Sequence, residues 1–125
     1  MPLLPRGGSI IFTSSGIAQG PNERAVDYGA SKAAVSHMIH SLARQLAPRG
    51  LRVNGVAPGL TYSPFLATAG FTDEIISAGL QATPPPFGRI QQPAELAPLF
   101  VSLADPSGTY TSGNVYSATG ATSFP

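Results

Sequence analysis

The sequence has no cysteine and few charged residues. The absence of cysteine from all 125 residues excludes a disulfide framework and a metal site built from thiolates. Charged residues make up 10% of the chain, against about 25% in an ordinary domain, so we expect much of the surface to be covered by something else. The net charge of +1 gives no reason to expect a nucleic-acid partner or binding to an anionic membrane.

Long apolar runs are also absent. No stretch approaches the roughly 20 apolar residues that a membrane span requires. The first residues, MPLLPRGGS, contain neither a long apolar core nor a charged leader of the kind found in signal peptides. We therefore expect a protein of a reducing, cytoplasmic compartment, with no membrane partner.

Apolar periodicity predicts alternating strands and helices. Strands are expected over 9–13, 51–57 and 114–117, long helices over 26–47 and 93–103, and one short helix over 72–80. Pro48 and Gly50 end the first long helix, and Pro93 begins the second. The short helix lies in a proline-rich segment, 60–92, that is otherwise irregular, and so long a loop is usually functional or disordered. The alternation predicts a parallel sheet with right-handed crossovers.

The first predicted strand, SIIFT at 9–13, is apolar and would lie on an open edge of the sheet. Proteins usually avoid such edges. Residues 5–8, Pro-Arg-Gly-Gly, are typical of the end of a helix. We therefore expect the complete domain to have further residues before position 1.

Tyr28 and Lys32 lie four residues apart in the stretch DYGASKAAV, within the first predicted helix. Residues at this spacing share a helix face, so the ammonium would lie beside the phenol. A neighbouring cation favours the phenolate form of a phenol, and a phenol in that setting can exchange a proton with a substrate hydroxyl or carbonyl. Lys32 is also the only lysine in the chain. The spacing alone more often indicates a solvated pair.

Ligands of parallel α/β sheets bind at the carboxyl ends of the strands. In this chain Ser14 and Ser15 follow the first predicted strand, and Pro58-Gly59 follows the second. The start of the first predicted helix faces both of these ends. Ser15, Tyr28, Lys32 and the Pro58-Gly59 turn can therefore converge.

Together these motifs resemble the C-terminal half of a short-chain dehydrogenase/reductase. The matching pieces cover nearly the whole chain in the family's order and spacing: GGSIIFTSS, YGASKAAV, LRVNGVAPG, GRIQQPAELAPLFVSLAD and SGNVYSATG. The segment FGRIQQPAELAP resembles the glucose/ribitol-dehydrogenase-like branch. The resemblance implies an α/β fold, in which residues 1–125 form the catalytic and substrate-loop half of a Rossmann-like, doubly wound parallel sheet. About three strands with flanking helices are expected, without the N-terminal nucleotide-binding half.

The resemblance also implies roles for individual residues. Tyr28 matches the family's general acid/base, and Lys32 matches the residue that assists it and holds the nicotinamide ribose of NAD or NADP. Ser15, 13 residues before the tyrosine, matches the hydroxyl that binds the substrate oxygen, with Ser14 as the alternative.

Further cofactor contacts are implied after the second strand. Pro58 and Gly59 match the turn that lets backbone approach the nicotinamide. Ser63 stands where the family usually has a threonine that binds the carboxamide. The implied function is hydride transfer between a nicotinamide cofactor and a small alcohol or carbonyl substrate.

The family's dimers imply a homo-oligomer formed through the helix that bears Tyr28. In this chain the helix lacks the preceding helix as a partner, so its apolar stripe over 35–46 is expected to be an exposed patch.

The chain departs from the family in three respects that matter. The glycine-rich turn between a strand and a helix, which cradles a pyrophosphate, is absent. The family's catalytic asparagine and the residue that selects NAD or NADP are absent as well. An alternative therefore stays open: the chain is a catalytically inactive fragment, or a module that pairs with a related subunit.

Other candidate residues leave their roles open. Phe65, Phe71 and Phe87 either line a substrate pocket, anchor a lid or hold the proline-rich segment on the core. His37 and His40 lie on one helix without a third ligand in view, so no metal site is expected. The hydrolase motif Gly-x-Ser-x-Gly does not occur.

Overall fold

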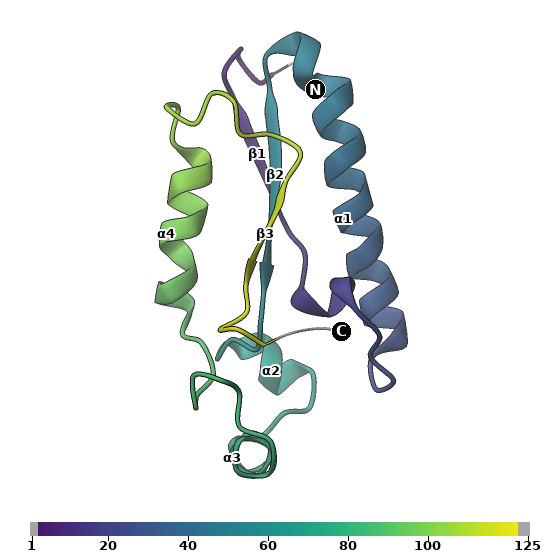
Figure 1. The fold of residues 1–125 in the computed structure, drawn as a ribbon, viewed down its shortest axis with the longest axis vertical. Coiled ribbons are helices and arrows are strands. Elements are labelled where there is room, and N and C mark those ends of the chain that lie inside the picture. The colour runs from purple at the N-terminus through teal and green to yellow at the C-terminus, as the bar shows by residue number, and fades with distance from the viewer. Residues whose placement is uncertain (1–2, 123–125) are drawn as a thin grey trace.

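The computed structural model describes residues 3–122 and contains one parallel sheet (Figure 1). Its three strands are β1 (Ser9–Thr13), β2 (Arg52–Pro58) and β3 (Val115–Ala118), in the order β1-β2-β3. Ser9 pairs with Arg52, and Gly55 pairs with Val115. The predicted parallel α/β sheet is confirmed, and within residues 3–122 β1 has no strand on its outer side.

Two long helices cover opposite faces of the sheet. α1 (Val26–Leu46) packs on one face and α4 (Pro93–Ala104) on the other, as Figure 1 shows. The shorter helices are η1 (Gly16–Gln19), η2 (Ala47–Arg49), α2 (Pro64–Thr68) and α3 (Asp73–Ala82). α2 and α3 lie beyond the carboxyl ends of the strands (Figure 1). This is the doubly wound arrangement that the sequence predicts.

Most predicted boundaries agree with the structure to within two residues. The exceptions are the turns η1 and η2 and the helix α2, which has only five residues and too little apolar periodicity to be predicted. Residues 3–8 form a bend and a turn rather than the expected end of a helix. Residues 1–2 lie outside the part that the structure describes.

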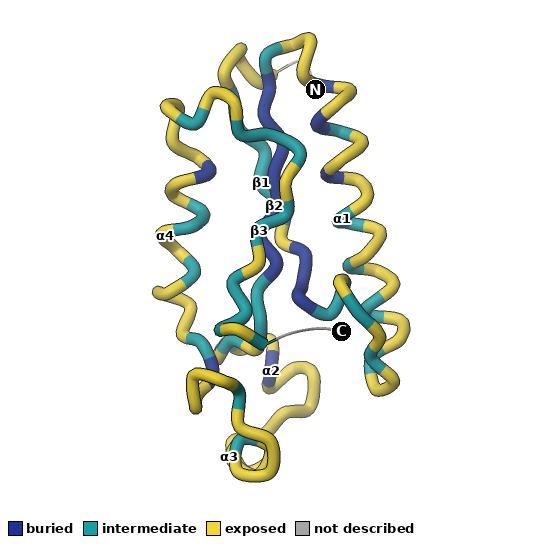
Figure 2. Tube along the Cα trace, in the orientation of Figure 1, coloured by how far each residue is buried: buried dark blue, intermediate teal, exposed yellow. Residues whose placement is uncertain are grey.

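The core lies between α1 and the sheet. Ile39, Ala43 and Leu46 of α1 pack against Leu51 and Val53 of the β2 region, and Figure 2 shows the buried positions concentrated along β2 and the facing side of α1. The three helix residues share one face because they are spaced four and three apart. The expectation of an exposed stripe over 35–46 is therefore wrong for most of the stripe: Ile39, Ala43 and Leu46 are buried against the sheet, and Met38 stays exposed.

Arg52 ties the far end of α4 to the sheet. Its side chain is buried, and its guanidinium donates hydrogen bonds to the carbonyls of Leu103 (3.0 Å) and Asp105 (2.9 Å). The hydroxyl of Ser9 donates to the same Leu103 carbonyl at 2.8 Å. A cation at the carboxyl end of a helix satisfies carbonyls that have no partner within the helix, so this buried charge is explained by the fold.

The start of α4 is held by an ion pair. Arg89 donates to both carboxylate oxygens of Glu95, at 2.7 and 2.8 Å. The same carboxylate accepts a hydrogen bond from the Gln92 backbone at 2.8 Å, which satisfies one of the unpaired N–H groups before the first turn. This arrangement also holds the end of the proline-rich segment against α4.

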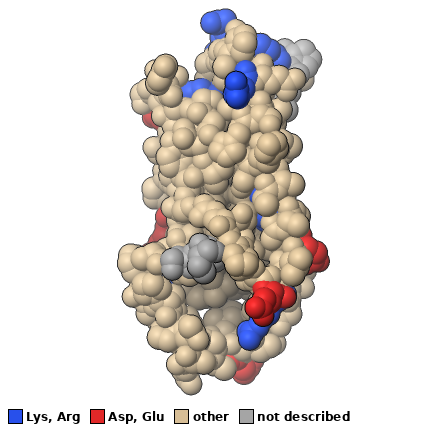
Figure 3. All heavy atoms as spheres, turned by 45° about the vertical axis from the view of Figure 1, so that its right-hand side comes forward, with Lys and Arg blue, Asp and Glu red and all other residues tan. Residues whose placement is uncertain are grey.

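The surface carries few charges, as the composition predicts. On the face shown in Figure 3, charged side chains gather towards the two ends and leave the middle largely uncharged. No helix within residues 3–122 combines the length and the apolar character needed to cross a membrane.

Gly55 lies where a side chain has no room. A Cβ at this position would overlap Cδ1 of the fully buried Ile39. We expect Gly55→Ala to lower the free energy of unfolding by about 1–3 kcal/mol, the usual cost of overpacking a core. Urea unfolding followed by circular dichroism measures it. Gly79→Ala, in α3 with nothing near its Cβ, is the matched control and should be neutral or stabilising. Equal stability of the two variants would contradict this packing.

The Glu95 ion pair predicts a pH dependence. The hydrogen bonds from Arg89 and from the Gln92 backbone lower the pKa of Glu95 from 4.5 to about 2. Because this pKa is depressed, the contribution to stability is complete above pH 4.5 and is lost as the pH falls towards about 2. It is a small contribution, since the pair is solvent-screened. A carboxyl ¹³C NMR titration measures it, with Arg89→Met expected to raise the pKa of Glu95. Titration of wild-type Glu95 near its ordinary value would contradict the pairing.

Candidate active site

Tyr28 and Lys32 lie together at the carboxyl end of β1. The Lys32 ammonium is 5.7 Å from the centroid of the Tyr28 ring, and it donates a hydrogen bond to the carbonyl of Thr13, the last residue of β1, at 3.1 Å. Tyr28 lies in the first turn of α1, where the Asp27 carboxylate accepts a hydrogen bond from the Tyr28 N–H at 2.8 Å. An acidic group in this position stabilises the start of a helix. The structure therefore brings the phenol and the ammonium to one strand end.

Ser14 and Ser15 are adjacent but have different partners. Ser14 is buried, and its hydroxyl bonds the Lys32 carbonyl at 3.1 Å and the Ser36 hydroxyl at 2.7 Å, so it fastens β1 to α1. The Ser15 oxygen accepts a hydrogen bond from the Ile17 N–H at 3.3 Å and caps η1. This bond uses the oxygen as acceptor and leaves the Ser15 proton available for donation.

The turn after β2 is held close to the end of β3. The Gly59 N–H donates to the Ala118 carbonyl at 2.9 Å, and a Cβ on Gly59 would lie 3.0 Å from Cα of Thr119. Glycine is therefore required here by the approach of a neighbouring backbone within the chain itself. Ser63 lies farther along, at the N-cap of α2, where its carbonyl accepts from the Leu66 N–H at 3.0 Å.

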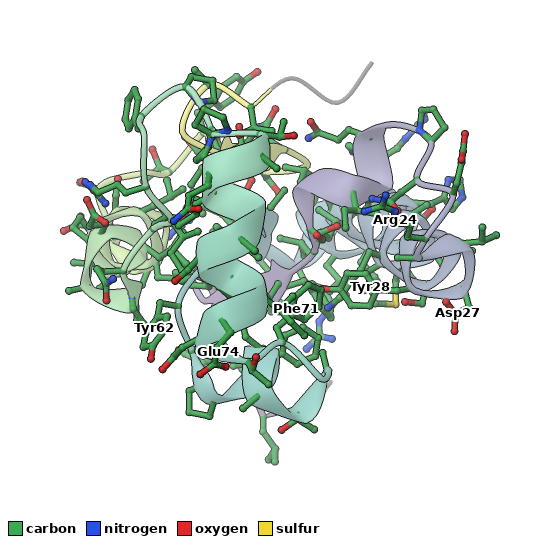
Figure 4. The ribbon with its side chains drawn as sticks, turned by 90° about the horizontal axis from the view of Figure 1, so that it is seen from below. Arg24, Asp27, Tyr28, Tyr62, Phe71 and Glu74 are labelled. Atoms are coloured by element: carbon green, nitrogen blue, oxygen red, sulfur yellow. The ribbon has the colours of Figure 1, made fainter. Side chains whose placement is uncertain are left out.

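An aromatic contact at the site could not be singled out from the sequence. The ring of Phe65, in α2, stacks on the ring of Tyr28 with centroids 6.0 Å apart and an angle of 30° between planes. Seen from below (Figure 4), Phe71 also lies on the side of the α2–α3 segment that faces Tyr28. Three phenylalanines occur in this part of the sequence, and nothing in their spacing distinguishes the one that reaches Tyr28.

The segment that carries Phe65 is fastened at both ends. Thr61 and Gln91 form an isolated parallel bridge, in which the Tyr62 N–H donates to the Gln91 carbonyl at 2.8 Å. Tyr62 also donates its hydroxyl proton to Asp73 at 3.1 Å, and this hydrogen bond, together with the negative charge of Asp73, raises the pKa of Tyr62. The two ends of the segment between β2 and α4 thus lie side by side, and the segment holds α2 beside Tyr28.

Two cavities lie away from Tyr28 and Phe65. One, of about 400 Å³, is lined by residues of α4 and of the loop before β3, including Leu99 and Thr111. The other, of about 380 Å³, lies between η1 and the first turns of α1, against Ile17 and Val26. Neither of these two cavities identifies the candidate site. It is identified by the positions of Tyr28 and Lys32 at the strand end. No group of three His, Asp or Glu side chains in residues 3–122 is placed to hold a metal ion.

Comparison with known proteins decides the family. The family model described as enoyl-(acyl carrier protein) reductase matches residues 1–121. The structure of a short-chain oxidoreductase from Pseudomonas aeruginosa superposes with a TM-score of 0.80 at 28% identity, covering 94% of this chain and 48% of that one. The chain belongs to the short-chain dehydrogenase/reductase family.

Two further members of this family are similar over most of the chain. The glucose and ribitol dehydrogenase homolog of rice is 41% identical over 114 residues, which are 91% of this chain and 37% of that protein. A 7α-hydroxysteroid dehydrogenase, solved in complex with NADH and 7-oxo glycochenodeoxycholic acid, superposes with a TM-score of 0.79 at 32% identity and covers 91% of this chain and 44% of that one. The chain thus spans less than half the length of these relatives.

The residues present fit one end of a nicotinamide cofactor. An ammonium has three donors, and the bond from Lys32 to Thr13 uses one, so two remain for hydroxyl groups. The glycine-rich turn that would cradle a pyrophosphate has no counterpart in the sequence. The donors of Lys32 therefore fit the ribose of a nicotinamide cofactor, whereas the motif that would bind its pyrophosphate is absent from the sequence.

The bonds of Ser14 predict a structural role for this residue. We expect Ser14→Ala to lower the free energy of unfolding by about 1 kcal/mol, because a buried hydroxyl that bonds two groups of α1 is lost. Ser41→Ala, at an exposed position of the same helix, is the control and should change stability little. Denaturant unfolding of both variants measures the difference, and an unchanged midpoint for Ser14→Ala would contradict the role.

Proposed function

We propose that this chain carries the catalytic half of an NAD(P)-dependent oxidoreductase that interconverts an alcohol and a carbonyl in a small molecule. The observation that carries the proposal is the position of Lys32, 5.7 Å from the Tyr28 ring and bonded to the end of β1. In a parallel α/β sheet this end is where ligands bind. Membership of a family with a relative solved in complex with NADH supports the choice of cofactor.

Tyr28 is the general acid/base in this proposal. In the reducing direction its hydroxyl gives a proton to the carbonyl oxygen, and in the oxidising direction its phenolate takes one from the alcohol. Help of this kind contributes roughly 10²- to 10⁴-fold to a rate. The Lys32 ammonium stabilises the phenolate by its positive charge. Ser15 donates its free proton to the same substrate oxygen, where negative charge grows in the transition state.

The cofactor side of the proposal uses the remaining residues. The nicotinamide, when bound, supplies or accepts the hydride. Tyr28 and Lys32 bond the ribose hydroxyls of NAD or NADP, Pro58 and Gly59 shape the backbone beside the nicotinamide ring, and Ser63 bonds its carboxamide. The motif that distinguishes NAD from NADP is absent from the sequence, so the proposal includes both cofactors.

The setting of the activity is part of the same proposal. Absence of cysteine suits a reducing, cytoplasmic compartment. We propose a homo-oligomer formed through α1, supported by the exposed Val26 and Met38 on this helix. Residues 1–125 would then be one partial domain, holding the catalytic residues and the substrate segment.

A second candidate has a specific observation in its favour. β1 is an edge strand within residues 3–122, and its unpaired backbone groups can bind another strand. With the pyrophosphate motif absent, the chain would then act as a catalytically inactive fragment or as a module that pairs with a related subunit.

Replacement of Tyr28 tests the mechanism. In a preparation that turns over, we expect Tyr28→Phe to lower kcat at least about 100-fold, because the proton donor is lost, with a much smaller change in cofactor affinity, because Lys32 still bonds the ribose. Tyr110→Phe is the control, since Tyr110 is fully exposed on the loop before β3. Steady-state kinetics and cofactor fluorescence measure the two quantities. Turnover near the wild-type rate in Tyr28→Phe would refute the role of Tyr28.

A cofactor titration distinguishes the two candidate functions. Fluorescence titration of the 125-residue chain with NADH and with NADPH should give micromolar binding if the first candidate holds. Absence of binding to both would favour the pairing module.

A further inference from the structure

The segment between β2 and α4 has an unusual chemical character. Residues 60–88 contain no Lys, Arg or His, and their two charged residues are Asp73 and Glu74. The same residues include four aromatic side chains, Tyr62, Phe65, Phe71 and Phe87. Of these rings, that of Phe65 lies against Tyr28, and Lys32 is the cation that the structure places beside the Tyr28 ring.

Contacts other than that of Phe65 hold this segment in place. The neighbouring Leu66 is 5% exposed and anchors α2, and the bridge between Thr61 and Gln91 closes the segment. Phe65 is 57% exposed although its ring stacks on Tyr28. A large apolar ring left half in water beside a proposed catalytic residue is available to a ligand.

We propose that Phe65 is a specificity-determining residue and that the site takes an uncharged ketone or alcohol whose reacting carbon belongs to, or adjoins, an apolar ring. This inference rests on the proposed function, because it uses the Tyr28 hydroxyl to bind the reacting oxygen. It names the substrate class, which the family membership leaves open.

The physical reason is the distance between the two rings. Because the Phe65 ring lies against the Tyr28 ring, with centroids 6.0 Å apart, a ring ketone whose oxygen bonds the Tyr28 hydroxyl would lie beside Phe65 as well. Offset and edge-to-face ring contacts add stabilisation beyond the apolar area they bury. Phe71 also lies on the side of the segment that faces Tyr28 (Figure 4).

The same surface disfavours two other classes. The hydroxyls of an open-chain polyol would lie against Phe65 without hydrogen-bond partners, which costs free energy. A carboxylate or phosphate on the far end of a substrate would find no Lys, Arg or His in residues 60–88 to bind it.

Ligand-observed saturation-transfer NMR on the 125-residue chain tests the inference without turnover. The probes are 1-tetralone as an uncharged ring ketone, ribitol as a polyol, and benzoylformate as an aromatic anion. We expect 1-tetralone to bind at least about tenfold more tightly than the other two. Phe65→Ala should weaken 1-tetralone binding about tenfold, and Phe65→Leu should weaken it less. Phe87→Ala, which removes an exposed ring of the same segment, is the matched control and should leave binding unchanged.

The outcomes are separate from those that test the proposed function. Tyr28→Phe keeps the ring stack, so it should retain most 1-tetralone binding even while turnover is lost. Binding of ribitol or benzoylformate as tight as that of 1-tetralone would overturn the substrate class. Equal loss in Phe65→Ala and Phe87→Ala, with unchanged circular dichroism, would overturn the role of Phe65. Turnover that survives in Tyr28→Phe refutes the proposed mechanism. The substrate class is decided separately, by the binding of the three probes.

Discussion

Burial of β2 on both faces is the constraint on which the rest of the structure depends. Its residues from Arg52 to Ala57 are all buried, with α1 on one side and α4 on the other (Figure 2). Gly55 is part of this constraint, since its missing Cβ leaves the room that Ile39 fills. A central strand covered on both faces holds the two helices at defined positions, and through them it positions the strand ends where the site lies.

The tightly packed part of α1 and the part that carries the proposed catalytic residues are different halves of one helix. Its buried residues, Ile39, Ala43 and Leu46, lie in the second half, whereas Tyr28 and Lys32 lie in the first. Ser14 joins the two regions by bonding the Lys32 carbonyl and Ser36. The phenol and the ammonium therefore stand on a rigid element without being buried, which leaves them accessible to a substrate and a cofactor.

The proposed substrate class follows from how the segment between β2 and α4 is fastened. Leu66 and the bridge between Thr61 and Gln91 hold it, and the ring of Phe65 stays half exposed beside Tyr28. The two serines after β1 differ in a similar way: Ser14 bonds α1, whereas Ser15, the proposed substrate-binding hydroxyl, uses its oxygen to accept from the Ile17 N–H. In both places one residue holds the fold and its neighbour is the one proposed to contact a ligand.

The sequence by itself determined the parallel α/β architecture, the family and the pairing of Tyr28 with Lys32, because these depend on periodicity and short spacings that a helix turns directly into proximity. The roles of the predicted site residues, Tyr28 and Lys32 included, remain predictions. The tertiary structure decided which side of α1 is buried, since the stripe over 35–46 meets β2 only once the sheet forms. It also decided that Gly59 approaches Thr119, and that Phe65, alone among three similar phenylalanines, stacks on Tyr28. These contacts join residues far apart in the chain, and no local pattern encodes where a half-exposed ring comes to rest.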